Sequence, residues 1–212
     1  EDFNNYWVYY RLSIARYRQI KEEQKRNATL LATDYYQKGL MAERNGERLQ
    51  AISFYFQGFR SIEKYLGEVI RVTIDNKEVL LTNEIYASIQ HLLDKIQVQV
   101  TPSEISLNRR VNQSAQTVMA KASYKDLTKP VSSLPLRAGF EKGAGDIFPT
   151  YQTDDTGQAK ILMTKISSKD IEQTVGVSVN IDALSGTSNS PIYTLVARTL
   201  TVPRAQVVLK VQ

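Results

Sequence analysis

Cysteine is absent from this sequence of 212 residues, and histidine occurs once, at His91. The absence of cysteine excludes disulfide bonds, thiol catalysis and cysteine-ligated metal sites. His91 lies beside an apolar helical stripe and has no second histidine with which to share a metal or a proton. We therefore interpret it as a packed or solvated residue on the flank of a helix, not as a catalytic group.

Long hydrophobic runs and strong charge clusters are also missing. No stretch approaches 18 uncharged apolar residues, so the sequence predicts no membrane-spanning helix. The net charge is +5, with 14 basic and 13 acidic residues in the first 100 positions and 13 and 9 in the remainder. Because nucleic-acid binding requires clustered basic residues, we read this excess as spread along the chain and predict no nucleic-acid partner.

The motifs of common enzymes are not found. There is no Gly-x-Ser-x-Gly elbow, no His-Glu-x-x-His and no dinucleotide fingerprint. Asp146, Asp154 and Asp155 lack the spacing of a calcium loop, and we interpret them as turn residues that bond their own backbone. The sequence predicts no metal, no cofactor and no enzymatic activity. A hydrolase with a pair of carboxylates stays open as an alternative.

A helical hairpin is predicted at residues 35–63. Small residues recur where two helices must approach closely, and large residues alternate with them. The small ones are Gly39, Ala42, Ala51 and Gly58, and the large ones are Tyr35, Leu49, Ile52, Tyr55 and Phe59. The Asn45-Gly46 pair predicts the turn, because glycine readily adopts the left-handed conformation that ends a helix.

Four residues of this hairpin, Gly39, Ala42, Ala51 and Tyr55, have the spacing of a tetratricopeptide repeat, and the hairpin resembles a single unit of that family. The resemblance implies that the first helix presents a surface to a peptide or protein partner. The surface residues implied in this way are Thr33, Tyr36, Leu40, Glu43 and Arg44. The alternative is that the hairpin is only a core element, completed by neighbouring helices.

Helices are predicted on both sides of the hairpin. Residues 3–26 form an amphipathic pattern whose apolar face we expect to be buried against the hairpin. That face consists of Phe3, Trp7, Tyr10, Ile14 and Tyr17. Residues 69–74 and 79–81 alternate like two short strands, and Thr82 is the expected N-cap of a further helix. The apolar stripe of this helix is Ile85, Ile89, Leu92, Leu93 and Ile96.

The composition changes from residue 97 onward. Nine of the 12 tyrosines precede residue 100, whereas serine, threonine and valine dominate after it. About seven short runs of β-type residues, separated by proline and glycine clusters, predict a β-sandwich. These runs are residues 105–107, 117–124, 134–140, 158–166, 174–181, 193–199 and 204–211. We expect residues 97–102 to form a short, stiff junction, because flexible linkers are rich in glycine and serine.

The most informative β segment is residues 130–166. Leu134, Leu136, Ala138 and Phe140 alternate toward one face, followed by a glycine-rich loop, a Thr-Asp turn and another strand. This order resembles bacterial immunoglobulin-like domains, and the resemblance covers most of residues 103–212. We therefore predict an α+β protein in two domains: a helical, tetratricopeptide-like domain at residues 1–100 and an immunoglobulin-like β-sandwich at residues 101–212.

The combination of helical segments and sandwich resembles the C-terminal part of cell-envelope lipoproteins of the LPP20 type from Bacteroidetes-like bacteria. The segments that carry this resemblance are YWVYYRLS, the hairpin, NEIYASIQHLL and the sandwich. It implies a location in the periplasm or at the outer membrane, with contact to the membrane only through a lipid anchor outside this chain. In that family, a small α/β domain and a lipidated N-terminus would precede residue 1.

We predict a non-enzymatic interaction module of the cell envelope. Its helical half would bind a protein or peptide of the envelope, and its sandwich would act as a spacer or as a second contact. The alternative is that the sandwich binds carbohydrate or a surface polymer through exposed aromatic residues. Phe148 and Tyr151, on either side of Pro149, are the best-placed candidates for that role.

Overall fold

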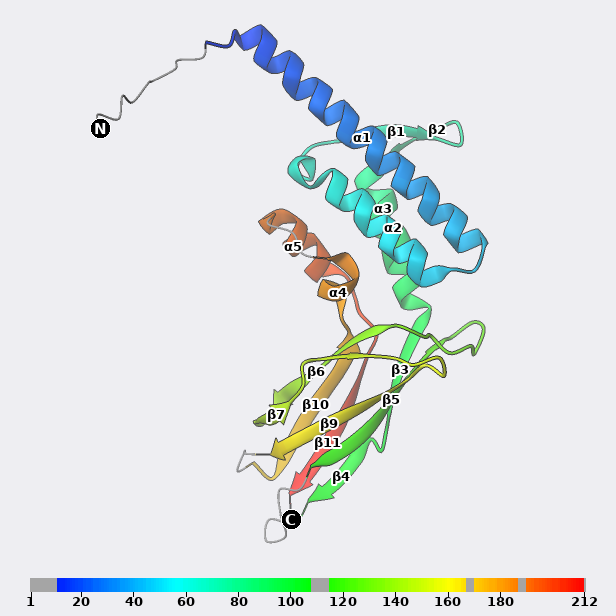
Figure 1. Ribbon diagram of the computed structural model, residues 1–212, viewed down its shortest axis with the longest axis vertical. Helices are drawn as coiled ribbons and strands as arrows, with labels where there is room; N and C mark the ends of the chain where they lie inside the picture. The colour runs from blue at the N-terminus through cyan, green and yellow to red at the C-terminus, as the bar shows by residue number, and fades with distance from the viewer. Residues whose placement is uncertain (1–10, 108–114, 167–169, 187–189, 212) are drawn as a thin grey trace, which may run out of the picture.

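The computed structural model describes residues 11–107, 115–166, 170–186 and 190–211. Figure 1 shows an elongated molecule with helices at one end and a β-sandwich at the other. No helix in the described part of the chain is long and apolar enough to span a membrane. The helical half contains, in order, α1 (Ile14–Arg44), α2 (Arg48–Ser61), a 3-10 turn (Glu63–Tyr65), β1 (Arg71–Ile74), β2 (Lys77–Leu80) and α3 (Leu81–Asp94).

α1 is one continuous helix of 31 residues, about 46 Å long at 1.5 Å per residue. The helix predicted at residues 3–26 and the first helix of the hairpin are therefore parts of the same element. Phe3, Trp7 and Tyr10 lie outside the described residues. Ile14 and Tyr17 are 71% and 52% exposed, so the expected burial of this face is wrong for both of these residues.

The predicted close approach of α1 and α2 is confirmed. A Cβ atom built on Gly39 would lie 2.3 Å from Cε1 of Tyr55, so no side chain fits between the two helices at this point. Ala42 and Ala51 are buried at the same interface. α1 ends at the predicted turn, where Gly46 has a φ of +81°, a conformation that costs glycine little.

α3 buries the apolar stripe predicted for it, from Ile85 to Leu93. β1 and β2 form the predicted hairpin ahead of this helix. The prediction of Thr82 as the N-cap is wrong, because the helix already begins at Leu81 and has no side-chain cap. Leu81 is fully buried, so packing of the first turn fixes the start of α3 in place of a capping hydroxyl.

Two β-sheets form the sandwich, with strand orders β3-β5-β9-β7 and β4-β11-β10-β6-β8. Neighbouring strands are antiparallel except for β4 and β11, which are parallel. Alternate residues of the long strands are buried between the sheets. The strands are β3 (Ile96–Thr101), β4 (Glu104–Leu107), β5 (Gln116–Tyr124), β6 (Pro135–Lys142), β7 (Gly145–Ile147), β8 (Thr150–Gln152), β9 (Gln158–Ile166), β10 (Glu172–Val179) and β11 (Arg204–Val211).

Two segments differ from their predicted structure. The run at residues 193–199 is a helix, α5 (Pro191–Thr199), whose N-cap Ser190 accepts a hydrogen bond from the backbone N–H of Tyr193. The expected junction at residues 97–102 is largely strand β3, which follows α3 after a single residue, Lys95. The proposed boundary at residue 100 thus lies inside a strand of the sandwich.

The helices α4 (Ile181–Ser185) and α5 connect the two halves. The hydroxyl of Tyr86 on α3 donates to the carbonyl oxygen of Thr199 over 3.1 Å. The side chain of Gln90 accepts from the backbone N–H of Thr201 and donates to its carbonyl oxygen. One cluster of buried hydrophobic residues includes members from both halves, so helices and sandwich share a core.

A second connection lies at the start of α2. Both terminal nitrogens of Arg48 donate to the carboxylate of Asp126 over 2.7 Å, and the guanidinium lies 4.7 Å from the ring centre of Tyr124. The hydrogen bonds from Arg48 lower the pKa of Asp126. Two-point pairing of this kind fixes orientation as well as distance, so it holds α2 against the sandwich.

Candidate functional site

The partner surface implied by the repeat resemblance is largely used for packing. Tyr36 is only 5% exposed, and its ring centre lies 5.6 Å from that of Tyr55. The expectation that Tyr36 is exposed is therefore wrong. The carboxylate of Glu43 accepts a 2.7 Å hydrogen bond from the hydroxyl of Tyr55. Burial first, and then this hydrogen bond, raises the pKa of Tyr55.

The other three residues of that surface do not form a binding face either. The hydroxyl of Thr33 donates to the carbonyl oxygen of Thr29 in its own helix. Leu40 is half-buried and packs against the core. Arg44 is exposed, at the C-terminal end of α1. These residues therefore stabilise the hairpin, and Arg44 alone remains fully available to a partner.

The two aromatic residues proposed for glycan binding lie in different surroundings. Phe148 is 62% exposed. Tyr151 is half-buried, and its hydroxyl both donates to the carbonyl oxygen and accepts from the N–H of Leu162 over 3.3 Å. Because Tyr151 lies on β8 and Leu162 on β9, this side chain joins the two sheets. The structure thus separates an exposed Phe148 from a structural Tyr151.

Asp154 organises a turn, as predicted. One oxygen of its carboxylate accepts hydrogen bonds from the N–H groups of Thr156 and Gln158 and from the hydroxyl of Thr156. The hydroxyl contact is the main cause of the lowered pKa of Asp154. Within the described residues, no group of three or more histidine, aspartate or glutamate side chains is arranged to hold a metal ion.

The N-terminal part of α1 is an open surface of the helical half. We call residues 11–31 the α1 arm; in Figure 1 it projects from the rest of the molecule. From Ile14 to Gln24 every side chain is exposed except that of Ile20, which is half-buried. Leu30 and Leu31, at the base of the arm, are 63% and 48% exposed. The arm is therefore a solvated helix with large apolar side chains.

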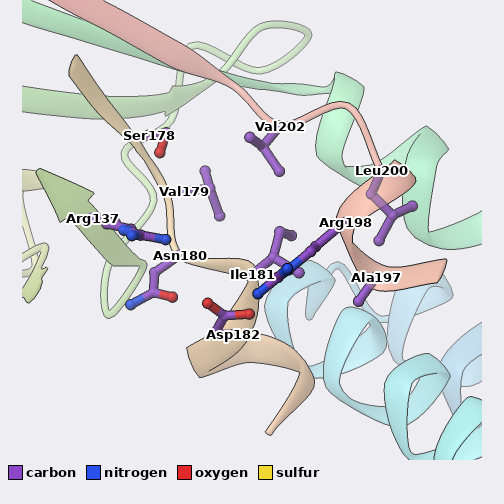
Figure 2. A pocket seen from close by; sticks show the side chains of 10 residues that line it. All are labelled: Arg137, Ser178, Val179, Asn180, Ile181, Asp182, Ala197, Arg198, Leu200 and Val202. Atoms are coloured by element: carbon purple, nitrogen blue, oxygen red, sulfur yellow. The ribbon is translucent and has the colours of Figure 1, made fainter. Parts of the chain in front are cut away.

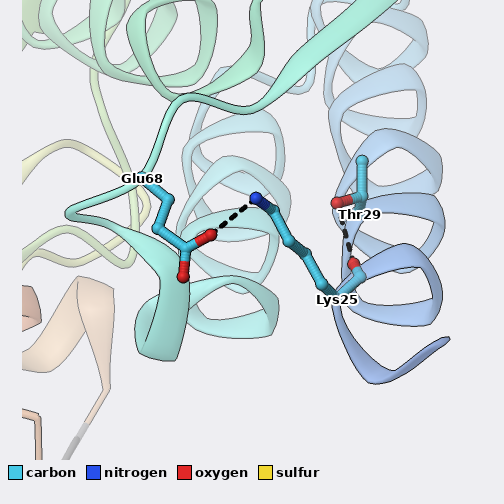
Figure 3. Close-up of polar contacts among 3 residues, drawn as sticks. All are labelled: Lys25, Thr29 and Glu68. Carbon is cyan, nitrogen blue, oxygen red and sulfur yellow. Dashed lines mark hydrogen bonds and ion pairs between the residues drawn. The ribbon is translucent and has the colours of Figure 1, made fainter. Parts of the chain in front are cut away.

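One polar contact links the arm to the segment that follows α2. The ammonium of Lys25 donates to the carboxylate of Glu68 over 2.6 Å, and the hydroxyl of Thr29 donates to the carbonyl oxygen of Lys25 over 2.9 Å (Figure 3). The hydrogen bond to Glu68 raises the pKa of Lys25. This contact lies near the base of the arm and leaves its outer turns open.

The arm also concentrates the positive charge of the protein. It contains six basic residues, Arg11, Arg16, Arg18, Lys21, Lys25 and Arg26, and two acidic residues, Glu22 and Glu23. Its net charge of +4 compares with +5 for the whole chain. The earlier interpretation of the charge as spread along the chain is thus wrong, since dividing the sequence at residue 100 averaged the arm with an acidic remainder.

Comparisons with known proteins give no family. No protein family and no curated protein matches the chain. Among solved structures, the D00-D0 domain of intimin has 13% identity over 43% of this chain, with a TM-score of 0.31. WR4, a C. elegans member of the MSP family, has 10% identity over 55%, with a TM-score of 0.37. The cell-surface chitinase ChiW from Paenibacillus has 13% identity over 62%, with a TM-score of 0.34.

These likenesses differ in how much of the other protein they include. The chain covers 98% of WR4, 41% of the intimin fragment and 15% of the chitinase. It thus spans about two fifths of the intimin fragment and a small part of the chitinase. With TM-scores below 0.5, none of these likenesses carries an argument about function, which must come from the geometry of the chain itself.

The arm could have been recognised from the sequence by a local count of charge. A window over residues 11–26 contains all six basic residues of the arm, whereas a division into halves conceals them. Its exposure could not have been recognised, because Ile14 and Tyr17 have the spacing of residues that are usually buried. α2, with 14 residues, is less than half as long as α1, with 31.

Proposed function

We propose that this protein is a non-enzymatic interaction module of the cell envelope, and that the α1 arm binds a segment of a partner protein. The partner segment is a helix with an apolar face and an excess of aspartate and glutamate. The β-sandwich carries the helical half and holds it in a fixed orientation. The following observations support this proposal.

The proposal rests on a single face of α1. Ile14 and Ala32 are 18 residues apart, which is five turns of an α-helix, so they lie on the same face about 27 Å from each other. Ala32 is fully buried, whereas Ile14 is 71% exposed. Tyr17, which is 52% exposed, and the half-buried Tyr35 are also 18 residues apart. Lys21 and Lys25, seven and eleven residues after Ile14, lie on this face as well. A face that is core at one end and, at the other, open with apolar and basic side chains is suited to a partner helix.

The partner chemistry follows from the basic side chains on and beside this face. The arm has a net charge of +4, and oppositely charged surfaces attract during encounter and fix the register of binding. A partner with apolar but no acidic residues would leave the basic residues of the arm without oppositely charged groups, and a basic partner would be repelled. We therefore assign an acidic, amphipathic helix to the arm in preference to an uncharged one.

Photo-cross-linking in envelope preparations tests this proposal. A photoreactive amino acid at Tyr17 should yield a cross-linked product with a protein that contains an acidic amphipathic segment. The matched control is the same amino acid at Met41, which is 62% exposed but lies on the opposite face of α1, 27 residues or seven and a half turns from Ile14. The Met41 variant should yield no such product.

The partner identified in this way is then purified for binding measurements. The double variant Ile14→Asp, Tyr17→Asp should lower its affinity by about tenfold or more, equivalent to about 1.4 kcal/mol, and Met41→Asp should not change it. Binding should also weaken as the salt concentration rises. A product made only of two copies of this chain, a product with lipid or nucleic acid, or equal products at both positions would overturn the proposal.

The location in the cell envelope is supported by the resemblance to lipoproteins of the LPP20 type, with the lipid anchor outside this chain. Fractionation of cells that produce the full-length protein tests this part separately. The protein should be recovered with the envelope and released when its lipidation site is removed. Recovery with the cytosol would contradict the location and leave the binding role of the arm to its own test.

Glycan binding by the sandwich is a second candidate, favoured by the exposure of Phe148. An exposed aromatic ring can stack on a sugar ring, but Tyr151 is engaged with β9 and would not take part without breaking its hydrogen bonds. Binding on a glycan array that is lost with Phe148→Ala and retained with Phe54→Leu would support this function. An array without binding would exclude it.

A further inference from the structure

A pocket of about 330 Å³ lies where the sandwich meets α4 and α5. It is lined by the start of β6, the end of β10, the first residues of α4, and the end of α5 with the segment that follows it (Figure 2). The volume is at the lower end of the range for small-ligand sites, about 300–1,000 Å³. None of the functions discussed above uses this pocket.

Two arginines from distant parts of the sequence extend into the pocket. Arg137 comes from β6 and Arg198 from the last turn of α5, and Figure 2 shows their guanidinium groups entering from opposite sides. Neither has an ion pair or a side-chain hydrogen bond to any residue in the described ranges of the chain. Their ten N–H donor sites are therefore available to a ligand.

A third arginine lies beside them. Ser178 on β10 is the direct cross-strand neighbour of Arg137 on one side and of Arg204 on the other. Directly paired residues point to the same face of a sheet, and adjacent strands are about 4.8 Å apart. The row Arg137, Ser178, Arg204 therefore places one cation on each side of the hydroxyl of Ser178, and Arg137 and Ser178 of this row line the pocket.

The remaining polar groups set the charge balance. Asp182 is the single acidic side chain among the lining residues, and no cation of the described chain lies within ion-pair distance of it. The side-chain oxygen of Asn180 accepts from the N–H of Ala183, which leaves the amide NH2 of Asn180 as a further donor. The pocket thus offers many donors and a net positive charge.

Part of the lining is apolar. Ile181, Leu200 and Val202 are among the residues that line the pocket (Figure 2). Such residues contribute by contact with carbon atoms of a ligand, whereas the arginines bind oxyanions through paired hydrogen bonds. A ligand that fits both features has an anionic head and a short carbon skeleton.

We propose that this pocket binds an organic oxyanion, in which a carboxylate or phosphate group lies between Arg137 and Arg198 and a short apolar chain contacts Ile181, Leu200 and Val202. Asp182 limits the ligand to a single anionic head, because a second negative group near it would be repelled. The site is separate from the α1 arm, so failure of either proposal leaves the other intact.

Isothermal titration of the whole chain with hexanoate, hexyl phosphate and hexanol tests the site. At least one of the two anions should bind, and hexanol should bind at least tenfold more weakly. Whichever anion binds more tightly identifies the head group. Because hydrogen bonds to charged groups contribute about 1.5–3 kcal/mol, Arg137→Gln and Arg198→Gln should each weaken binding by roughly tenfold or more.

The control variant is Arg44→Gln, which removes an exposed arginine at the far end of α1 and should leave binding unchanged. Thermal unfolding of each variant checks that the fold is retained. Chemical-shift changes on binding should map to α4, α5, the start of β6 and the end of β10. Hexanol binding as tight as that of either anion, equal losses with Arg44→Gln, or shifts that map elsewhere would overturn the proposal, as would no binding by either anion.

Discussion

In the C-terminal half of α1, Ala32, Tyr36 and Gly39 are buried against neighbouring helices, whereas in the arm Ile14 and Tyr17 lie open to solvent. Both sets of residues belong to the same helix and to the same face. The buried half includes small residues that allow close packing against α2. The open half has large apolar residues and a net charge of +4.

This difference shows that whether a helix face can be covered and what covers it are separate questions, and the spacing of apolar residues answers only the first. A stripe of apolar residues at intervals of three and four shows that a helix face can be covered, but the occupant can be the same chain or another one. Gly39 identifies the internal occupant, because a Cβ atom there would meet Tyr55. No such glycine accompanies Ile14 and Tyr17, and basic residues surround them. The local sequence around a stripe thus carries the information about its occupant.

The largest expected contrast is between two tyrosines on this helix. Tyr36→Ala should lower the free energy of unfolding by about 3–5 kcal/mol, because it removes a buried ring from the core. Tyr17→Ala should change it by less than about 0.5 kcal/mol, as expected for an exposed position. Urea denaturation followed by circular dichroism measures both. Equal losses for the two variants would remove the distinction between the halves of α1.

A smaller loss should follow from adding a methyl group at the interface of α1 and α2. Gly39→Ala places a Cβ atom 2.3 Å from the ring of Tyr55, and overpacking of this kind costs about 1–3 kcal/mol. The matched variant is Gly67→Ala, where a Cβ atom would have no neighbour within 4 Å. Thermal unfolding should show a lower Tm only for Gly39→Ala. An unchanged Tm would mean that the helices separate without cost.

The contact between Arg48 and Asp126 should make the junction sensitive to acid. Since the pKa of Asp126 is lowered in the folded state, its stabilising effect is present above its unfolded pKa of about 3.9. This effect is lost as the pH falls through the lower folded value. The difference in stability between the wild type and Asp126→Asn should therefore vanish at strongly acidic pH. A difference that persists below the folded pKa would contradict this assignment.

The smallest effect is expected at the base of the arm. Glu68→Gln weakens the ion pair with Lys25, and pairs this exposed contribute less than about 1 kcal/mol. Global stability should therefore barely change. Hydrogen exchange of amides near Lys25 should become faster, because local opening of the arm is easier. Unchanged exchange in this region would show that the ion pair does not hold the arm.

Much of the fold could be predicted from short-range patterns. The turn at Asn45-Gly46, the stripe of α3 and the alternating strands are each specified by residues close together in the chain, and these predictions are confirmed. The prediction of a strand at residues 193–199 is wrong because valine and leucine suit both a strand and the helix α5. Its Ser190-Pro191 start, a typical N-cap followed by proline, was the signal that distinguishes them.

The sites were harder to predict, for two physical reasons. Tyr36 lies four residues after Ala32 and three before Gly39, so the helical spacing indicates that it is buried at the interface. The resemblance to a repeat family implied instead that Tyr36 belongs to an exposed surface. Arg137 and Arg198 are 61 positions apart, and they line the same pocket only because of the sheet register and the placement of α5. No short-range pattern in the sequence predicts that these two side chains line one pocket.

Thiol labelling tests most directly whether the apolar face of α1 is open along the arm. Because the chain contains no cysteine, a single cysteine at Tyr17 or at Ala32 reports only its own position. We predict that Tyr17→Cys reacts with a maleimide nearly as fast as a free peptide thiol, while Ala32→Cys reacts only through unfolding, orders of magnitude more slowly. Protection of Tyr17→Cys as strong as that of Ala32→Cys would contradict it.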